Sequence, residues 1–377
     1  MRLKLIISLF FIFSNYQNFA QISFAPERNR IFEIWKEKNG LYFNLYSNGF
    51  FKNNEYFLKT VSGYTLFGIQ NIPSLLFKPN KYFFAQGGIY LKKDFGTDGF
   101  VKIAPYYLFS LNKNDFSLNF GNYESNVNHR LYDPIFANEQ LMKNYLEEGI
   151  SLKVKKKKIY SELWINWEKQ QYWLSDFNEK FTLGNNTRLP IYQNKGLKIV
   201  VPFQFLAMHS GGQIDTAGLP TSTIINSAIG LELSKTFRKK SGINYISAHV
   251  NYLIYKDISE NAGLPYTNGN GIYANVNFGF LKNFKASLGY WQAHHFIAPK
   301  GDILYQSVSY NPQNLAELEP ERRIVQLGFA YQKQIGKDIN LQVLAQPFYD
   351  FQNQRVDYSY SLFLTFQPNI LLTKRTN

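Results

Sequence analysis

The sequence predicts an all-β chain that forms one transmembrane antiparallel β-barrel of about sixteen strands, with fourteen to eighteen as the range. Three observations predict it. Apolar and polar residues alternate with a period of two along many segments, short polar turns alternate with longer loops, and no later apolar run could form a transmembrane helix. In such a barrel the short turns lie in the periplasm and the long loops lie outside the cell.

Residues 1–20 have the pattern of an export signal. Arg2 and Lys4 precede an apolar run from Leu5 to Phe13, and Ala20 supplies the small residue that precedes a cleavage site. This run is far shorter than the roughly 20 apolar residues of a spanning helix. We therefore expect a signal peptide at 1–20, an N-terminal periplasmic segment at 21–39 and an outer-membrane β-barrel at 40–377, and hence a protein of the outer membrane.

The strands are predicted from the period of two. Between residues 271 and 281, apolar side chains occupy the even positions, and tyrosine, asparagine and glycine occupy most of the odd positions. Similar alternation predicts sixteen strands, at 40–48, 64–77, 81–93, 98–110, 114–121, 147–154, 158–168, 179–190, 197–208, 223–236, 243–256, 270–281, 284–296, 323–334, 338–349 and 355–367.

The connections support this assignment independently. Every second one is a tight polar turn, such as Pro79-Asn80 or Lys282-Asn283, whereas 122–146, 209–222, 257–269 and 297–322 are long. An even number of strands then places both ends of the mature chain in the periplasm. About eleven residues follow Phe366, so either the last strand extends to Leu371 or Leu372, or a short basic tail follows it.

Composition excludes several classes of protein. The chain has no cysteine, which removes disulfides, cysteine-bound metals and thiol nucleophiles. The net charge is +14, but no recognition helix or other nucleic-acid-binding motif accompanies it, so no nucleic-acid partner is expected. The expected partners are outer-membrane lipid, the barrel-assembly machinery, and a small solute or a polysaccharide. No cofactor is expected.

Several stretches resemble a family of porin-like outer-membrane β-barrels of the Bacteroidota. They are SGYTLFG (62–68), KKDFGTDGF (92–100), NHRLYDPIF (128–136), HSGGQID (209–215), GDILYQSVS (301–309), EPERR (319–323), PFYD (347–350) and YSYSLFLTFQPNILLTK (358–374). The similarity runs through nearly all of the mature chain. It implies a barrel fold and an outer-membrane location, and it carries over no catalytic residues.

Charged residues on the predicted inward faces are the main candidates for function. A charge on the lipid-facing side costs roughly 2–4 kcal/mol for Arg or Lys at the midplane, so these residues belong in the lumen. Loop 122–146 is the predicted filler or constriction of the lumen, with His129, Arg130 and Asp133, and a short helix is expected within 138–148. The predicted lumen-lining residues are Lys102, Glu162, Glu168, Lys198, Glu232, Lys285, Arg355 and Asp357.

Catalytic and metal-binding arrangements are weaker hypotheses. His209, Ser210 and Asp215 have the residue types of nucleophilic catalysis, but their spacing also fits an ordinary glycine-containing loop. His129 with Glu124 and Asp133 is a second acid–base set. The adjacent pair His294-His295 is poorly placed for a shared metal, because neighbouring strand residues point to opposite faces.

Most of the aromatic residues near strand ends are predicted to belong to the interface girdles of the barrel, and any that point inward could stack on sugar rings. These aromatic residues are Tyr106, Tyr107, Trp164, Trp167, Tyr172, Trp173, Tyr290, Trp291 and Phe348.

These patterns predict a porin-like channel for passive diffusion of small hydrophilic solutes. The alternative is a closed surface barrel that binds a polysaccharide or a protein partner through its long extracellular loops. An enzyme is not expected. An outer-membrane hydrolase is a weaker hypothesis than either the channel or the surface-binding barrel.

Overall fold

The computed structural model describes residues 34–35, 37–125, 129–156, 159–212, 217–237, 242–260 and 263–374. The predicted signal peptide and most of the segment 21–39 therefore lie outside the described residues. No helix among the described residues is long and apolar enough to cross a membrane.

The described chain forms one antiparallel sheet in which each strand from β1 to β15 pairs with the next along the sequence. Its strands are β1 (Gly40–Phe57), β2 (Ser62–Asn80), β3 (Phe83–Asp94), β4 (Lys102–Lys113), β5 (Phe116–Glu124), β6 (Leu146–Lys156), β7 (Ile159–Lys169), β8 (Lys180–Asn194), β9 (Leu197–Ser210), β10 (Ser222–Thr236), β11 (Ile243–Asp257), β12 (Asn268–Phe280), β13 (Phe284–His294), β14 (Glu321–Gln334), β15 (Ile339–Asp350), β16 (Arg355–Phe366) and β17 (Asn369–Lys374).

The sheet closes because β1 pairs with both ends of the chain. Residues 47–55 of β1 pair with β16, and residues 40–44 pair with β17. β16 and β17 are therefore one strand, interrupted at Pro368, whose ring nitrogen has no hydrogen to donate. The prediction of a closed all-β barrel of sixteen strands is confirmed, and the last strand does continue past Phe366, as far as Lys374.

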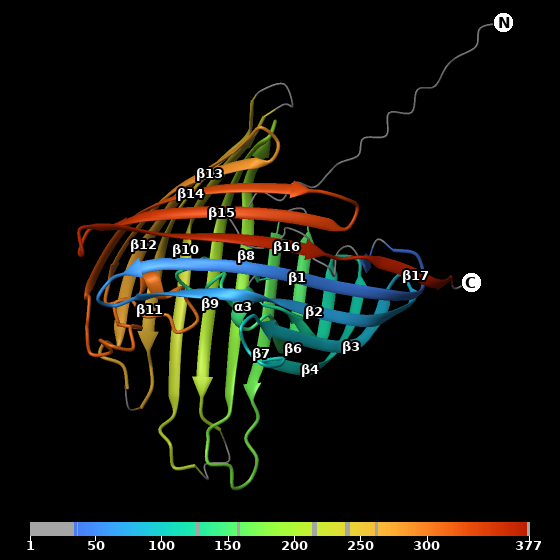
Figure 1. The fold of residues 1–377 in the computed structure, drawn as a ribbon, viewed down its shortest axis with the longest axis horizontal. Coiled ribbons are helices and arrows are strands. Elements are labelled where there is room, and N and C mark those ends of the chain that lie inside the picture. The colour runs from blue at the N-terminus through green and yellow to red at the C-terminus, as the bar shows by residue number, and fades with distance from the viewer. Residues whose placement is uncertain are drawn as a thin grey trace, which may run out of the picture.

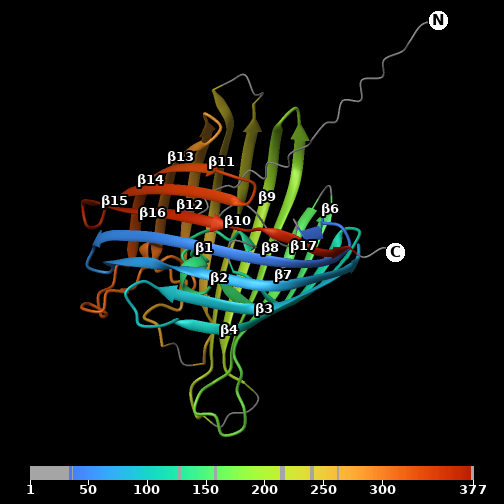
Figure 2. The same ribbon diagram turned by 45° about the vertical axis from the view of Figure 1, so that its right-hand side comes forward.

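The strands are strongly tilted, as closure of a sheet requires. In Figure 1, β1, β2, β15 and β16 run almost horizontally across the near wall, while β7 to β9 run almost vertically across the far wall. The turned view in Figure 2 shows the same crossing and places β17 beside the beginning of β1.

Strand boundaries agree closely except at β1, which was predicted to end at residue 48 and continues to Phe57. Its outward positions beyond residue 48 include Asn53 and Glu55, which interrupt the apolar face and hide the alternation. The loop that follows is short, and it spans only residues 58–61.

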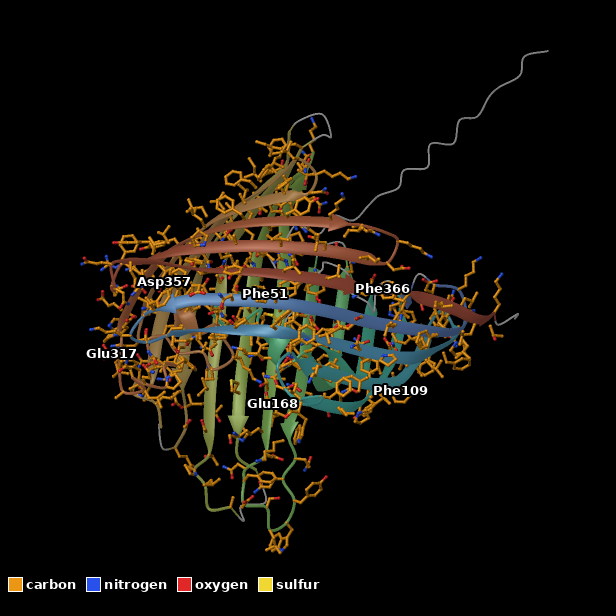
Figure 3. All side chains as sticks on the ribbon, viewed as in Figure 1. Phe51, Phe109, Glu168, Glu317, Asp357 and Phe366 are labelled. Carbon is orange, nitrogen blue, oxygen red and sulfur yellow. The ribbon has the colours of Figure 1, made fainter. Side chains whose placement is uncertain are left out.

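The outward face of the sheet is apolar. Figure 3 shows side chains covering the outside of the ribbon, among them Phe109 and Phe366, which belong to strands far apart in sequence. Exposed leucine, isoleucine, valine and phenylalanine residues occur on this face of almost every strand, for example Leu75, Ile150 and Phe203. Such a continuous exposed apolar surface suits lipid and would be unstable in water.

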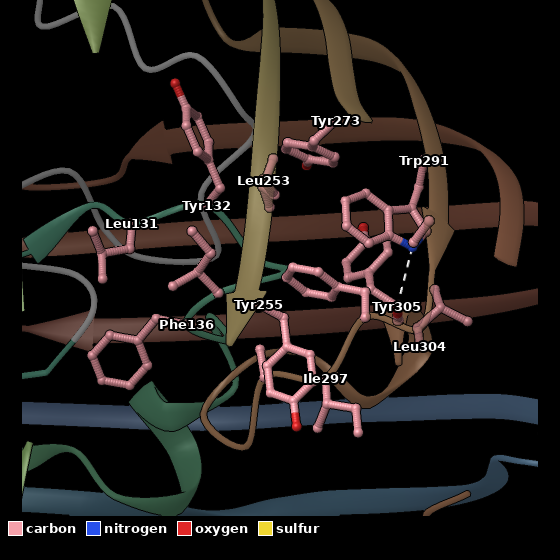
Figure 4. Packing of buried hydrophobic residues seen from close by; sticks show 14 of the residues in the cluster. Leu131, Tyr132, Phe136, Leu253, Tyr255, Tyr273, Trp291, Ile297, Leu304 and Tyr305 are labelled. Atoms are coloured by element: carbon pink, nitrogen blue, oxygen red, sulfur yellow. Dashed lines mark hydrogen bonds between the residues drawn. The ribbon is translucent and has the colours of Figure 1, made fainter. Parts of the chain in front are cut away.

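The inside of the barrel is filled by two inserted loops. The third loop (residues 125–145) and the seventh loop (residues 295–320) follow β5 and β13, and most of their apolar side chains are fully buried. The predicted short helix is present as a single turn, α3 (Gln140–Lys143), with Leu141 and Met142 buried. Figure 4 shows how Leu131, Tyr132 and Phe136 of the third loop lie near Ile297, Leu304 and Tyr305 of the seventh.

Candidate functional site

The two inserted loops are held to each other by backbone hydrogen bonds. The amide of Asp302 donates to the carbonyl oxygen of Asp133 (2.9 Å), and the amide of Ala137 donates to the carbonyl oxygen of Lys300 (2.8 Å). A Cβ atom at Gly301 would lie 2.2 Å from the carbonyl oxygen of Pro134. Glycine is therefore required where the two loops touch, because any larger residue would force them apart.

The polar inner wall supplies partners for the loop backbone. Gln70 Nε2 donates to the carbonyl oxygen of Leu141 (2.8 Å), and Asn226 Nδ2 donates to that of Ile297 (2.8 Å). Asn186 Nδ2 donates to the carbonyl oxygen of His129 (2.6 Å). Buried loop backbone must find hydrogen-bond partners. The many inward-facing amides therefore fulfil a packing role rather than line an aqueous pore.

Ion pairs join the third loop to the wall on two sides. His129 is fully buried, with Nε2 3.0 Å from Glu147 and Nδ1 3.0 Å from Glu162, and its ring stacks on Trp164. Burial alone would lower the pKa of His129, but the two carboxylates outweigh it and raise this pKa to about 9. On the other side Glu139 pairs with Lys52 at 2.5 Å.

A further ion pair lies beneath Tyr132. Arg188 of β8 pairs with Glu232 of β10, and the hydroxyl of Tyr132 donates to Glu232 at 2.6 Å. Near the contact between the loops, burial together with the neighbouring Asp302 raises the pKa of Asp133 to about 7. The third loop is thus held by charge pairs as well as by apolar packing.

The eight predicted lumen-lining residues all lie at positions that share a face with the buried side chains of their strands. Glu162, Glu232 and Asp357 are buried in the ion pairs of the filled interior, Asp357 with Arg355 at 2.9 Å. Glu168 pairs with Lys300 of the seventh loop at 2.7 Å. Lys102, Lys198 and Lys285 lie near strand ends and are partly or fully exposed. Their role in solute passage stays a prediction.

The predicted constriction residues lie where the third loop enters the barrel. His129 and Asp133 are buried, and Arg130 is half-buried with a φ of 60°. Asn186 Nδ2 and Gln204 Nε2 both donate to its carbonyl oxygen. These residues therefore belong to the packed interior. The set of His129 with Glu124 and Asp133 is not assembled around His129, whose ring contacts Glu147 and Glu162 instead.

The girdle prediction is correct for some aromatics and wrong for others. Tyr107, Trp167, Tyr172, Trp173 and Tyr290 are exposed or half-buried on the outside or in a loop. Tyr106, Trp164, Trp291 and Phe348 instead face inward and are buried, Trp291 donating to the carbonyl oxygen of Tyr305 (Figure 4). Trp164 is two residues after Glu162 on the same strand, so both side chains point to the same face. The predicted inward position of Glu162 therefore also predicts that Trp164 faces inward.

A histidine–hydroxyl pair lies on the opposite, outward face of the barrel. His209, at the end of β9, is directly opposite Thr223, at the start of β10, and His209 Nδ1 is 2.8 Å from Thr223 Oγ1. Their odd positions place both side chains on the lipid-facing side, at the outer ends of their strands. When Nδ1 carries no proton, it accepts a hydrogen bond from the threonine hydroxyl. This is the geometry of a nucleophile beside its base.

The pair continues a row of outward side chains across four strands. Trp167 is directly opposite Phe181, and Phe181 is directly opposite His209, whose ring centroid lies 5.0 Å from the phenyl ring. The row ends in Thr223 and the exposed Ile258, whose amide donates to the carbonyl oxygen of Thr223. An imidazole and a hydroxyl group therefore lie beside apolar side chains at the outer ends of their strands.

Sequence spacing had indicated Ser210 rather than Thr223. Ser210 is the next residue along β9, so it points to the inner face and is opposite Ser222. Asp215 lies outside the described residues. Thr223 is fourteen residues from His209 in the sequence, and the pairing register of β9 and β10 places the two side by side.

No group of three His, Asp or Glu side chains that could hold a metal ion occurs in the part of the chain that the structure describes. His294 ends β13 on its outward face, and His295 has a φ of 52° and stacks on Tyr266. Their rings are 3.7 Å apart, because the strand ends between them.

These features define a transmembrane β-barrel with a filled lumen and a hydrogen-bonded histidine–threonine pair on its lipid-facing side. The chain belongs to the lipid A 3'-O-deacylase-type family, whose model matches residues 33–375. A comparison with curated proteins gives no significant match.

The fold is shared with solved outer-membrane proteins. OprD from Pseudomonas aeruginosa is 9% identical with a TM-score of 0.51, over 90% of this chain and 98% of that one. OmpT of Vibrio cholerae in its trimer form is 9% identical with a TM-score of 0.51, over 88% and 100%. Its loop L8 deletion mutant is 12% identical with a TM-score of 0.52, over 88% and 100%. At these identities the likeness concerns the fold alone.

The family corrects one expectation. The chain was not expected to be an enzyme, yet its family is described by an enzymatic activity, removal of an acyl chain from lipid A. The earlier expectation is therefore wrong. It failed because no catalytic motif with a fixed spacing occurs in the sequence. The predicted origin in the Bacteroidota stays a prediction.

Proposed function

We propose that this protein is an outer-membrane hydrolase that cleaves an ester-linked acyl chain from a lipid of the outer leaflet. The observation that carries the proposal is the hydrogen bond between His209 and Thr223 on the lipid-facing rim. The family name supplies the substrate class, an acylated glycolipid such as lipid A. The apolar row beside the pair offers a surface along which an acyl chain can lie.

The reaction follows from the two side chains. Thr223 Oγ1 attacks the ester carbonyl carbon while its proton passes to His209, and the alcohol leaves with that proton. Water then attacks the acyl-threonine and gives a proton to His209, and His209 returns this proton to Thr223 Oγ1 as the fatty acid is released. Lys256 of β11 is opposite Ile225, so it lies diagonally from Thr223 on the same outward face, within reach of a long side chain. Its charge would stabilise the negative oxygen that forms during attack.

The test measures fatty-acid release from purified lipid A by the full barrel in detergent micelles, using mass spectrometry. We expect Thr223→Val and His209→Gln to abolish release, and Thr223→Ser to retain part of it. Ser210→Ala is the matched control, because it removes a neighbouring hydroxyl on the inner face and should leave the rate unchanged. Loss of activity in Ser210→Ala but not in Thr223→Val would refute this site, and no release by the unaltered protein would refute the function.

Replacement of Lys256 by glutamine should lower the rate of release by roughly 100-fold, as removal of one oxyanion donor does in other acyl-transfer enzymes. Lys195, an exposed lysine in the β8–β9 turn at the other end of the barrel, provides the control as Lys195→Gln. A rate for Lys256→Gln equal to that of the control would remove Lys256 from the mechanism.

The filled interior argues against the porin-like channel. Both inserted loops pack on the wall, and the buried inward-facing charges Glu162 and Glu232 are engaged in ion pairs rather than lining a water-filled path. We expect no stable conductance steps from the folded barrel in a planar bilayer. A variant in which residues 131–142 and 297–307 are replaced by short glycine–serine links should conduct, because a sixteen-stranded barrel is wide enough for water once it is emptied. Uniform steps from the unaltered protein would favour the channel.

A further inference from the structure

The outer end of the β1–β2 hairpin contains a surface cavity of about 520 Å³, and His209 is not among the residues that line it. We call it the hairpin pocket. It is lined by Asn53, Asn54, Glu55, Tyr56, Phe57, Leu58, Ser62, Gly63, Tyr64, Thr65 and Asn311. A cavity of this volume accommodates a small organic ligand.

The pocket is held in shape by the seventh loop. The amide of Tyr310 donates to the carbonyl oxygen of Thr60 (2.8 Å), and Asn311 Nδ2 donates to that of Lys59 (3.1 Å). Ser309 Oγ also donates to the carbonyl oxygen of Thr60, at 3.2 Å. The hairpin loop and the seventh loop thus form one surface, and a ligand would meet walls that are already ordered.

One wall of the pocket carries a chain of polar groups. Asn53 Nδ2 donates to Glu55 at 2.5 Å and to the hydroxyl of Tyr360 at 3.1 Å, while Thr65 Oγ1 donates to Asn53 Oδ1 at 2.8 Å. Asn54 is 1% exposed and donates to Glu139, but its Oδ1 has no hydrogen-bond partner among the described residues. Asn54 therefore faces the interior of the barrel, and the wall open to a ligand is formed by the outward side chains of Asn53, Glu55 and Thr65.

The charge of the lining restricts the ligand. Glu55 is the only charged residue among the lining residues. The nearest cation on the adjoining strand, Arg355, lies over the ring of Phe57 and is already bound to Asp357 and to the carbonyl oxygen of Phe57. An anion such as a phosphate would be repelled, whereas a neutral or cationic ligand with several hydroxyl groups fits. The exposed ring of Phe57 adds aromatic surface of the kind that packs on sugar rings.

We propose that the hairpin pocket binds one neutral or amino sugar unit of a glycan. Asn53, Glu55 and Thr65 provide the hydrogen bonds, and the exposed ring of Phe57 provides the apolar contact. The pocket lies on β1 and β2 and the histidine–threonine pair on β9 and β10, so the two sites occupy opposite walls of the sixteen-stranded barrel. This proposal therefore does not depend on the proposed hydrolysis.

The test uses the full barrel in detergent and four probes, N-acetylglucosamine, glucosamine, glucose and glucosamine 6-phosphate, with binding followed by saturation-transfer NMR. We expect the three sugars without phosphate to bind, and the phosphorylated sugar to bind at least tenfold more weakly. Glu55→Gln should reduce that difference, because it removes the repelling charge. Absence of binding by all four probes, or tighter binding of the phosphorylated sugar, would overturn the proposal.

Variants locate the binding. Asn53→Ala and Thr65→Val should each weaken binding by about tenfold, the usual effect of one lost hydrogen bond. Ser161→Ala is the control, because Ser161 is an outward hydroxyl on β7, hydrogen-bonded to Thr187. Thr223→Val should leave sugar binding unchanged even if it abolishes hydrolysis. Unaltered binding by both pocket variants would place the sugar elsewhere and end the proposal.

The sugar unit bound in the hairpin pocket could belong to a free glycan or to a glycolipid, because both present the same hydroxyl groups. Vesicles of phosphatidylethanolamine with and without monoglucosyl diacylglycerol, both containing the barrel, separate the two sources. Displacement of soluble glucose only in the glycolipid vesicles means that the pocket takes a lipid-linked sugar. Equal binding in both means that it takes a free one.

Discussion

Replacement of His129 by leucine is expected to lower the free energy of unfolding by about 3–5 kcal/mol. His129 is fully buried between Glu147 and Glu162, at 3.0 Å from each. Leucine would leave Glu147 without its charged partner inside the barrel, while Glu162 would keep Lys153 at 3.3 Å. Urea titration of the barrel in lipid vesicles, followed by tryptophan fluorescence, measures the change.

The double variant His129→Leu with Glu147→Gln separates charge from packing. Because the amide carries no charge, it should recover much of the loss. His294→Leu is the matched control, since His294 is exposed on the outer face. Equal stability of His129→Leu and His294→Leu would mean that the third loop is not held by this ion pair.

The same histidine makes the stability dependent on pH. The pKa of His129 is about 9 in the folded chain and roughly 6.5 when unfolded, so the folded state favours the protonated ring. Its contribution is therefore fully present below pH 6.5 and is lost as the pH rises to about 9. Unfolding of the unaltered barrel should become easier over this interval, and His129→Leu should remove most of that dependence. An unchanged pH profile in the variant would contradict the assignment.

Replacement of Arg322 by methionine should have an effect of similar size, a loss of about 3–5 kcal/mol. Arg322 is fully buried on β14, with its guanidinium 2.9 Å from Asp350 and 2.9 Å from the carbonyl oxygen of Leu304 in the seventh loop. It also pairs with Glu319. Methionine fills much of the space but leaves the Asp350 carboxylate buried and uncompensated, so the wall and the seventh loop should separate.

Neighbouring residues supply the controls for Arg322. Arg323 is the next residue, faces outward and is 48% exposed, so Arg323→Met should change the stability by less than about 0.5 kcal/mol. Asp350→Asn in the Arg322→Met background should restore part of the loss, because Asp350 Oδ1 still accepts from the amides of residues 352 and 353. A loss that Asp350→Asn does not reduce would point to packing rather than charge. Protease sensitivity of the seventh loop provides a second measurement.

Alternation along single segments was sufficient to predict the strands and the faces of their side chains. The period of two in residues 271–281 predicted β12, and the parity of Glu162 and Glu232 predicted their inward position. These properties are local, because successive side chains of a strand point to opposite faces whatever surrounds the strand. The alternation also places Trp164 and Trp291 on the inner face, where they are buried. Their residue type and their position near strand ends had instead predicted a place in the girdles.

The partners of those side chains were decided only by the tertiary structure. His129 meets Glu162 because the third loop turns into the barrel, and loops distant in sequence pack there against the wall. Thr223 meets His209 because the register of β9 and β10 places it there, while the adjacent Ser210 points away. Sequence determined which residues face inward and which face lipid, since that depends on backbone geometry. Contacts between strands and loops depend on how the whole sheet closes and on its pairing register. For this reason only the tertiary structure showed that the lumen is filled and that the candidate site lies between β9 and β10.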